Sequence, residues 1–399
     1  MHFCFTVNVR KRQMRTTLLL KKGAAILCAL CIGASAVACK SDDNKSKSSE
    51  KSSSASSEIK TLTDEEVAEL TIKIEGDDFY CGDSKIWFNG ANTPWDNWND
   101  FGGSFDETFW DEHFADLREA GVNSTRIWFN CSDMVGVKLN SDGSFKEVTD
   151  AHWEHCDKLF EIAQKHGIYI MATMLSFDHF KDSNRNYSLW RDMIMNNDNI
   201  DSFVEGYIKP FAQRYDSNPY LWSIDLMNEP DWVYENSECG NIGWEYLASY
   251  FGRSAAAIHQ CSDVLVTVGV ATVKYNSDMR TGNMICDELL IQEAENELGY
   301  LDFYSTHYYS WQAQWYGTAY EKTPEEFGLV TEKPCLIGEC AVSDNQSGAL
   351  DKYTGAYENG WDGILVWTSN GVDDCGNYDL MIEGSLPTYE AHADEIFPS

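Results

Sequence analysis

The stretch LWSIDLMNEP at residues 221–230 decides how this chain is expected to fold. It is an apolar run with the length of a buried strand, and it ends on the acid Glu229 directly after the amide Asn228. A second apolar run, at residues 334–338, ends in the same way on Glu339. A carboxylate at the end of a buried strand is costly unless it has a task. The two stretches therefore predict two buried strands, each with a functional glutamate at its carboxyl end.

Short apolar strands alternate with amphipathic helices from residue 71 onward. The predicted strands lie at residues 86–90, 124–129, 168–175, 221–227, 264–268, 302–308, 335–338 and 363–367. The predicted helices lie at residues 106–120, 150–166, 200–215, 242–260 and 346–358, with a last helix after Pro387. Strands covered by helices in this order indicate a parallel sheet that is buried on both faces. Residues 72–81 are expected to add a small hairpin before the first strand of this sheet.

Closed on itself, such a sheet is a (β/α)8 TIM barrel, and we predict this α/β fold for a single domain at residues 71–399. A doubly wound open sheet is the alternative, but no Gly-rich nucleotide-binding loop follows the first strand. In a TIM barrel, the loops that follow the strands form the catalytic face. The loops expected there lie at residues 92–105, 176–199, 231–241, 309–323 and 369–379.

Residues 1–38 have the features of a bacterial lipoprotein signal peptide. Basic residues precede an apolar segment at residues 23–33, and the box Ala36-Val37-Ala38-Cys39 follows, with Ala36 where Leu is usual. We expect cleavage before Cys39, a lipid on Cys39, and export to the bacterial cell surface as a membrane-anchored lipoprotein. Met14 is an alternative start. A transmembrane anchor is the alternative to a signal peptide, although the apolar segment is shorter than the about 20 residues that span a bilayer.

Residues 39–70 are expected to form a Ser-rich flexible linker. This stretch has almost no apolar side chains up to residue 57, so it cannot bury a core. We expect a tether between the lipid and the folded domain, with a small helix at residues 64–70.

Charge restricts the partners of the protein. The formal net charge of −34 repels nucleic acid and anionic lipid, and it disfavours acidic polymers. A neutral substrate is compatible with this charge; the alternative is that acidity keeps an exported protein soluble. We expect no nucleic-acid partner, contact with a membrane only through the N-terminal lipid, and a monomer.

The cysteines do not indicate a metal site. Beyond Cys39 they show no Cys-x-x-Cys pair, and several lie in apolar strands, where a thiol acts as a small hydrophobic group. One or two disulfides remain an alternative. Residues 140–143 look like a turn and lack the bidentate glutamate of a calcium loop. Asp373 and Asp374 fit a solvated loop better than a calcium site. No metal ion and no cofactor is expected.

Further polar and aromatic side chains fall at the predicted strand ends. Arg126 lies inside the second strand, where a buried guanidinium needs a carboxylate partner, in a structural ion pair or in a site. His307 and Tyr309 lie two positions apart at the end of the sixth strand and so point the same way, and Trp367 ends the eighth. Together with two glutamates, such residues can supply the proton donor and the nucleophile or base that cleave a glycosidic bond.

These residues lie in five motifs: TRIW at 125–128, NEP at 228–230, HYY at 307–309, IGE at 337–339 and VWT at 366–368. With these motifs, the chain from about residue 71 to 399 resembles glycoside hydrolase family 5 and its wider clan of retaining TIM-barrel enzymes. The resemblance implies that Glu229 is the general acid/base of a double displacement and that Glu339 is its nucleophile.

The resemblance also implies supporting roles. Asn228 would hold the 2-hydroxyl beside the scissile bond, and Arg126 and Tyr309 would bond the nucleophile and keep it ionised. His307 would lie near the acid/base, and Trp367 would form the floor of the subsite at the cut.

Two expectations depend on details of this site. Retention predicts that the two carboxyl groups lie about 5–5.5 Å apart, whereas about 8 Å or more would favour inversion. Many family members have a histidine after the third strand. The candidate here is His179, and its distance from the strand end leaves its role open.

Tryptophans near the strand ends indicate how a substrate would bind. Trp95 and Trp98 follow the first strand and Trp311 follows the sixth, so they are expected to stack on sugar rings along an open cleft; the alternative is that they pack the loops.

An open cleft implies internal cleavage of a neutral β-1,4-linked polysaccharide. We favour β-mannan, because the acid/base strand and the short Gly-Glu turn look like the mannanase branch; cellulose and other β-glucans stay open. The alternatives are a catalytically silent glycan-binding lipoprotein, an exo-acting β-glycosidase and a solute-binding lipoprotein.

Overall fold

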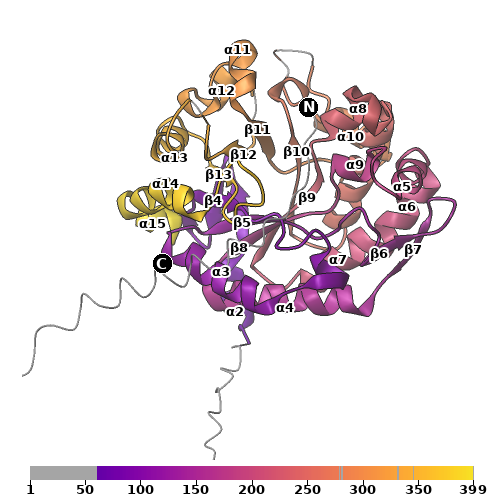
Figure 1. The fold of residues 1–399 in the computed structure, drawn as a ribbon, viewed down its shortest axis with the longest axis horizontal. Helices are drawn as coiled ribbons and strands as arrows, with labels where there is room; N and C mark the ends of the chain where they lie inside the picture. Colours follow the sequence, from indigo (N-terminus) through magenta and orange to yellow (C-terminus); the bar gives the residue numbers. More distant parts are fainter. Residues whose placement is uncertain (1–60, 278, 280–281, 330–331, 345, 399) are drawn as a thin grey trace, which may run out of the picture. The chain divides into compact units, whose positions relative to one another are not determined.

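Eight parallel strands form the centre of the structure and close into a barrel (Figure 1). The computed structural model describes residues 61–277, 279, 282–329, 332–344 and 346–398. In the order in which they pair, the strands are β4 (Phe88–Asn92), β5 (Ser124–Trp128), β8 (Tyr169–Thr173), β9 (Leu221–Asn228), β10 (Leu265–Val270), β11 (Tyr304–Tyr308), β12 (Cys335–Ala341) and β13 (Gly363–Trp367). β13 pairs with β4 in parallel and so closes the sheet. The predicted (β/α)8 fold is confirmed, and the open doubly wound sheet is wrong.

Helices cover the outside of this barrel. They include α3 (Glu107–Glu119), α4 (Asp150–His166), α5 (Tyr187–Ile194), α6 (Asn197–Phe203), α7 (Lys209–Tyr215), α9 (Trp244–His259), α10 (Asp287–Ala294), α13 (Ala349–Glu358), α14 (Tyr378–Ala391) and α15 (Ala393–Ile396). All residues of the strands from β5 to β12 in the barrel are buried. This is the burial expected of parallel strands with helices on the outside and side chains filling the inside.

Local sequence signals set where the helices begin and end. The Asp106 side chain accepts hydrogen bonds from the backbone N–H groups of Thr108 and Phe109 at the start of α3, and Thr149 caps α4 in a similar way. α4 ends at Gly167, whose φ of 65° lies in the left-handed region that favours glycine. Each helix thus returns the chain to the amino-terminal end of the next strand, and the carboxyl ends of all strands share one face.

A small antiparallel sheet covers the amino-terminal end of the barrel. It consists of β1 (Ile72–Glu75), β2 (Asp78–Cys81) and β3 (Ser84–Lys85), and it includes the predicted hairpin. Phe79 of β2 packs against Phe88, Trp222 and Phe303 at ring-centroid distances of 5.2, 5.4 and 5.2 Å. Because these three residues lie at or near the amino ends of their strands, the sheet leaves the opposite end of the barrel for a site.

Several predicted boundaries differ from the structure, and two of the differences have a clear cause. The first barrel strand begins at Phe88, two residues later than predicted. The reason is that the N–H of Ile86 donates to the carbonyl of Phe79 in β2, so Ile86 pairs with the small sheet. The last long helix, α14, begins at Tyr378 and contains Pro387 in its interior, so a start after this proline is wrong. The side chain of Asn377 caps α14 by accepting from the N–H of Leu380, and this cap sets the start.

The segment at residues 137–148 forms a two-stranded hairpin, β6 (Val137–Leu139) and β7 (Phe145–Val148), around the predicted turn. The predicted helix at residues 64–70 is α2 (Asp64–Leu70), which starts with a reciprocal pair of hydrogen bonds between Thr63 and Glu66. The predicted signal peptide, the predicted lipid site at Cys39 and the predicted linker up to residue 60 lie outside the described residues. Within the described part, the nine cysteines form no disulfide with one another, and no helix is both long and apolar enough to cross a membrane.

Candidate active site

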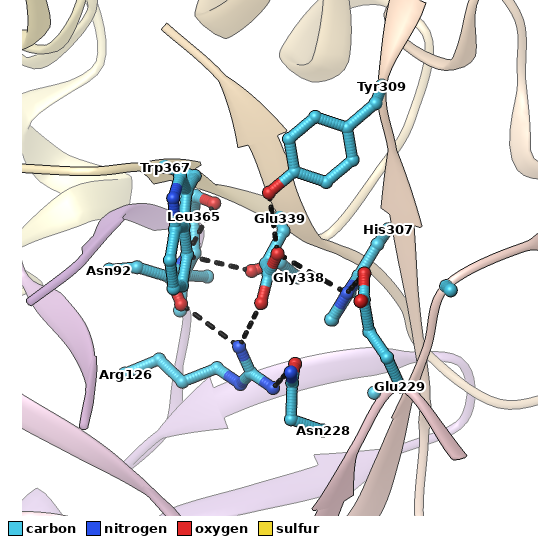
Figure 2. A network of polar contacts seen from close by, with 12 residues as sticks. Asn92, Arg126, Asn228, Glu229, His307, Tyr309, Gly338, Glu339, Leu365 and Trp367 are labelled. Atoms are coloured by element: carbon cyan, nitrogen blue, oxygen red, sulfur yellow. Dashed lines mark hydrogen bonds and ion pairs between the residues drawn. The ribbon is translucent and has the colours of Figure 1, made fainter. Parts of the chain in front are cut away.

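The residues predicted at the strand ends meet at the carboxyl-terminal mouth of the barrel (Figure 2). Arg126 lies in β5 and His307 in β11, and Glu339 lies in β12. The others end a strand or follow one directly: Asn228 ends β9 and is followed by Glu229, Tyr309 follows β11, and Trp367 ends β13. Side chains from five strands thus converge because the barrel brings their carboxyl ends together.

Arg126 is fully buried and is the hub of the hydrogen-bond network. Its Nη1 donates to Glu339 Oε1 at 2.7 Å and to Asn92 Oδ1 at 3.1 Å. Its Nη2 donates to Asn228 Oδ1 at 2.9 Å. Its Nε and Nη2 both donate to Asp225 Oδ2, at 2.9 and 2.6 Å. The guanidinium therefore lies between two carboxylates, and its fixed geometry orients both amides.

Glu339 is 3% exposed and is held through both of its carboxylate oxygens. In addition to the Arg126 contact at Oε1, the Tyr309 hydroxyl donates to Oε2 at 2.7 Å. Burial raises the pKa of the Glu339 carboxyl above its ordinary value, against the lowering effects of His307, of Arg126 and of the hydrogen bond from Tyr309. Two donors on one carboxylate favour its ionised form and fix its plane.

Glu229 sits at a sharp turn between β9 and the short helix α8 (Pro230–Glu235), with left-handed dihedrals of φ 50° and ψ 56°. A non-glycine residue in this region is strained, and such strain concentrates at functional sites. Its carboxylate Oε2 accepts a hydrogen bond from Trp232 Nε1 at 2.9 Å. Burial raises the pKa of Glu229 to about 7, against the lowering effect of that hydrogen bond. This carboxyl group can therefore hold a proton near neutral pH.

His307 lies between the two glutamates. Its Nδ1 is 3.1 Å from Glu229 Oε1 and 3.5 Å from Glu339 Oε2. Burial lowers the pKa of His307 to about 4, so the imidazole is neutral at pH 7. One oxygen of each carboxylate and one histidine nitrogen lie within 4.8 Å of one another, and these three residues are the group in the described part that could hold a metal ion.

Tryptophans lie on both sides of this centre. Trp95 contacts Trp98, Trp128 and Trp367 edge to face, at ring-centroid distances of 4.8, 5.8 and 6.3 Å. The Trp367 indole N–H donates to Asp373 Oδ2 at 2.7 Å, which fixes its ring. Three of these rings, those of Trp95, Trp98 and Trp367, are partly exposed and available for stacking.

A second group of tryptophans lies next to Glu229. Trp232, which bonds Glu229, lies 6.2 Å from Trp311, and Trp311 lies 5.9 Å from Trp315. Trp311 and Trp315 are 45% and 59% exposed, which is unusual for indoles that only pack a loop. The structure therefore places indoles next to both sides of the carboxylate pair.

His179 supports a loop rather than the carboxylates. It lies in the 3-10 turn Phe177–Phe180, where its Nδ1 is 3.0 Å from the Ser176 carbonyl and its ring packs edge-on against Trp190 at 4.7 Å. Ser176 in turn accepts a hydrogen bond from Asn228 Nδ2 at 3.4 Å. His179 thus holds the loop that contacts Asn228.

Comparison with known proteins identifies the family. The family model Cellulase (glycosyl hydrolase family 5) matches residues 83–380, which is more than half of the chain. This chain belongs to glycosyl hydrolase family 5. The resemblance inferred from the five motifs is confirmed.

Relatives and solved structures agree with this family. A mannan endo-1,4-beta-mannosidase of Cryptopygus antarcticus is 24% identical over 335 residues, covering 77% of this chain and 86% of that protein. One of Mytilus edulis is 24% identical over 329 residues, covering 75% and 88%. The structure of a beta-1,4-mannanase from Aplysia kurodai has a TM-score of 0.72 at 21% identity, covering 82% of this chain and 99% of that one. At this identity the structural likeness establishes the shared fold.

Three contributors to this family 5 site were missed in the sequence. Asp225 receives two hydrogen bonds from Arg126, and Asn92 links Arg126 to the backbone carbonyls of Gly338 and Leu365 at 3.0 and 2.9 Å. Trp232 donates to the acid/base candidate. A signal existed for Asp225, because an acid inside an apolar strand needs a buried cation and Arg126 is one. Asn92 and Trp232 carry no comparable signal in the sequence, since asparagine and tryptophan both occur in loops without a functional role.

Proposed function

We propose that the protein is a retaining endo-β-1,4-mannanase that acts by double displacement, with Glu339 as nucleophile and Glu229 as acid/base. The observation that carries this proposal is the carboxylate pair at the barrel mouth. One oxygen of Glu229 lies within 4.8 Å of an oxygen of Glu339. This distance agrees with the about 5–5.5 Å between the carboxyl groups of retaining enzymes and is shorter than the about 6.5–9.5 Å of inverting enzymes.

The first step forms a glycosyl-enzyme. A Glu339 oxygen attacks the anomeric carbon, the bond to the leaving oxygen breaks, and Glu229 gives its proton to that oxygen. Arg126 and Tyr309 favour the ionised form of Glu339 that this attack requires. The pKa of Glu229 near 7 keeps the acid protonated in neutral solution, because burial disfavours its charge.

The second step releases the sugar. Glu229, now ionised, takes a proton from water, the water oxygen attacks the anomeric carbon, and the bond to Glu339 breaks with retention. The neutral His307 beside both carboxylates adds no charge at neutral pH, so the proton on Glu229 controls the charge of the pair in each step.

Asn228 is oriented for the substrate by its neighbours. Arg126 Nη2 donates to Asn228 Oδ1 and so fixes the amide oxygen. Asn228 Nδ2 donates one hydrogen to Ser176 Oγ, and its second hydrogen is left to meet a sugar. A donor at this place suits the 2-hydroxyl beside the scissile bond, where hydrogen bonds strengthen in the transition state. Trp367, fixed by Asp373, supports the floor of the same subsite.

The substrate assignment to β-mannan is supported by the named activity of the relatives from Cryptopygus and Mytilus and by the exposed indoles on both sides of the carboxylates. Trp95 and Trp98 on one side and Trp311 on the other would stack on sugar rings of an internal chain segment. A silent glycan-binding protein is disfavoured, because both carboxylates and all the donors that tune them are in place.

We further propose that residues 1–38 are a lipoprotein signal peptide, that Cys39 carries the lipid, and that residues 39–70 tether the catalytic domain, residues 71–399, to the cell surface. The box at residues 36–39 and the Ser-rich composition of the linker support this arrangement. Loss of membrane association in Cys39→Ser, measured by fractionation and metabolic lipid labelling, tests it; an unchanged membrane fraction without lipid label would contradict it.

The test of the activity is hydrolysis of a polysaccharide panel. The chain without its signal peptide is incubated with linear β-mannan, carboxymethyl-cellulose and xylan, and reducing ends are counted. We expect the highest rate on mannan, a rapid fall in viscosity typical of internal cuts, and a β-anomer as the first product by NMR. Glu229→Gln and Glu339→Gln serve as matched inactive controls. Failure to hydrolyse any β-glycan, or an α-anomer as first product, would refute the proposal.

A further inference from the structure

Three atoms that could bind a metal ion lie close together, one each from Glu229, His307 and Glu339. His307 Nδ1 lies 3.1 Å from Glu229 Oε1 and 3.5 Å from Glu339 Oε2. The ligands of a tetrahedral Zn²⁺ ion, at bond lengths of about 2.0–2.1 Å, lie about 3.3 Å from one another. Both measured distances are close to this value. The ligand atoms of the two carboxylates lie within 4.8 Å, so a small rotation of the Glu229 side chain, which is 13% exposed, completes the triangle.

The remaining oxygens of both carboxylates are already bound by donors. Trp232 Nε1 donates to Glu229 Oε2, and Arg126 Nη1 donates to Glu339 Oε1. The Tyr309 hydroxyl occupies one lone pair of Glu339 Oε2 and leaves the other. Outer donors of this kind orient the ligands of metal sites in proteins. These donors hold both carboxylates in place, with one oxygen of each near His307 Nδ1.

The charge of the cluster also matches a divalent cation. Arg126 forms a buried ion pair with Asp225, at 2.6 Å, and these two charges offset each other. A divalent ion would displace the proton of Glu229, and two carboxylates with one imidazole would then face the ion in a buried space. One histidine nitrogen with two carboxylate oxygens suits Zn²⁺, whereas Mg²⁺ and Ca²⁺ prefer sites made of oxygen alone.

We propose that Glu229, His307 and Glu339 form an inhibitory binding site for a divalent transition-metal ion, with Zn²⁺ as the best match. The inhibition rests on the proposed function. A bound ion would take the lone pair with which Glu339 attacks and the position of the proton that Glu229 delivers. It would also fill the space of the anomeric carbon, so substrate and metal compete.

The test measures binding without turnover. Zn²⁺ is titrated into the chain without its signal peptide by isothermal calorimetry, with Glu229→Gln and Glu339→Gln as site variants. His259→Gln is the matched control, because His259 faces a single carboxylate, Asp302, at 3.0 Å. We expect one tight Zn²⁺ site in the wild type and the control, and at least about tenfold weaker binding in both site variants. Mg²⁺ is expected to bind at least about tenfold more weakly than Zn²⁺ in the wild type.

Equal Zn²⁺ affinity in the wild type and both site variants would place the ion on thiols or surface carboxylates and overturn the proposal. Circular dichroism of each variant excludes loss of fold as the cause of weaker binding. In the activity assay, inhibition by Zn²⁺ should be competitive with mannan and reversed by a chelator; noncompetitive inhibition would also overturn it. A protein that binds Zn²⁺ through these residues but hydrolyses no glycan would refute the proposed function and leave the metal site standing.

Discussion

Replacing Trp232 by Phe is expected to extend the activity of the protein to higher pH. The Trp232 indole N–H donates to Glu229 Oε2 at 2.9 Å, and phenylalanine keeps an aromatic ring but has no donor. A hydrogen bond to a carboxylate favours its ionised form, so its loss favours the protonated form and raises the pKa. Burial raises the pKa of Glu229 to about 7 in the wild type, and the Trp232 bond is the largest contribution that opposes this rise.

The size of the shift follows from the strength of this bond. Hydrogen bonds to charged groups contribute about 1.5–3 kcal/mol and neutral ones about 0.5–1.5 kcal/mol. Trp232 is half-buried, so solvent can replace part of the bond, and about 1 kcal/mol is a reasonable value. One pKa unit corresponds to 1.36 kcal/mol, and the pKa should therefore rise by about 0.7 units.

The assay is the pH profile of kcat/KM on a soluble mannooligosaccharide. The acid must be protonated in the free enzyme, so Glu229 sets the alkaline limb of this profile. We expect the limb to move upward by about 0.7 units in Trp232→Phe, with the acidic limb unchanged. Trp311→Phe is the matched control, because Trp311 neighbours Trp232 at 6.2 Å but lies one ring further from Glu229. An alkaline limb that stays in place or moves to lower pH would refute the reasoning.

Four other variants test separate parts of the structure. Glu339→Gln should lose at least about 10³-fold in kcat on all substrates, whereas Glu229→Gln should retain cleavage of aryl glycosides whose leaving groups need no proton, as followed by phenolate release. Asp225→Asn weakens two charged hydrogen bonds to the guanidinium and should lower kcat about 10–100-fold with little change in KM, measured on protein shown to be folded. Phe79→Ala should lower the free energy of unfolding in urea by about 3–5 kcal/mol and leave kcat unchanged, because this ring fills the closed end of the barrel.

The barrel could be predicted because its pattern is local. Each strand is a short apolar run, and helices such as α3, α4 and α14 begin at a capping side chain, so the alternation is readable without tertiary information. Errors arose where a residue that looked like the start of an element belongs to a neighbouring or earlier element. Ile86 looks like the start of a barrel strand, but its N–H bonds to the small sheet. Pro387 looks like the start of a helix, but the cap at Asn377 had already begun one.

The site could be predicted only in part, since the sequence shows which side chains lie at strand ends and not which of them touch. The pairing of Arg126 with Glu339 followed from the family resemblance, and the structure adds Asp225 as a second partner of the same guanidinium. Trp232 escaped prediction because its contact depends on the left-handed backbone at Glu229, which turns the chain back on itself. Such contacts arise from three-dimensional pairing and leave no spacing in the sequence.

The two glutamates have the same side chain and similar positions, and their neighbours make them different. Arg126 donates to Glu339, and the hydrogen bonds of Glu229 come from the neutral donor Trp232 and the contact with His307. Burial raises the pKa of both carboxyl groups, and the direct hydrogen bonds from Arg126 and Tyr309 favour the ionised form of Glu339. This difference in donors is how a pair of acids divides into nucleophile and proton donor. Asp225 forms a buried ion pair with Arg126 at 2.6 Å and so fixes the guanidinium that donates to Glu339. The asymmetry of the site therefore originates in the buried network beneath the carboxylates.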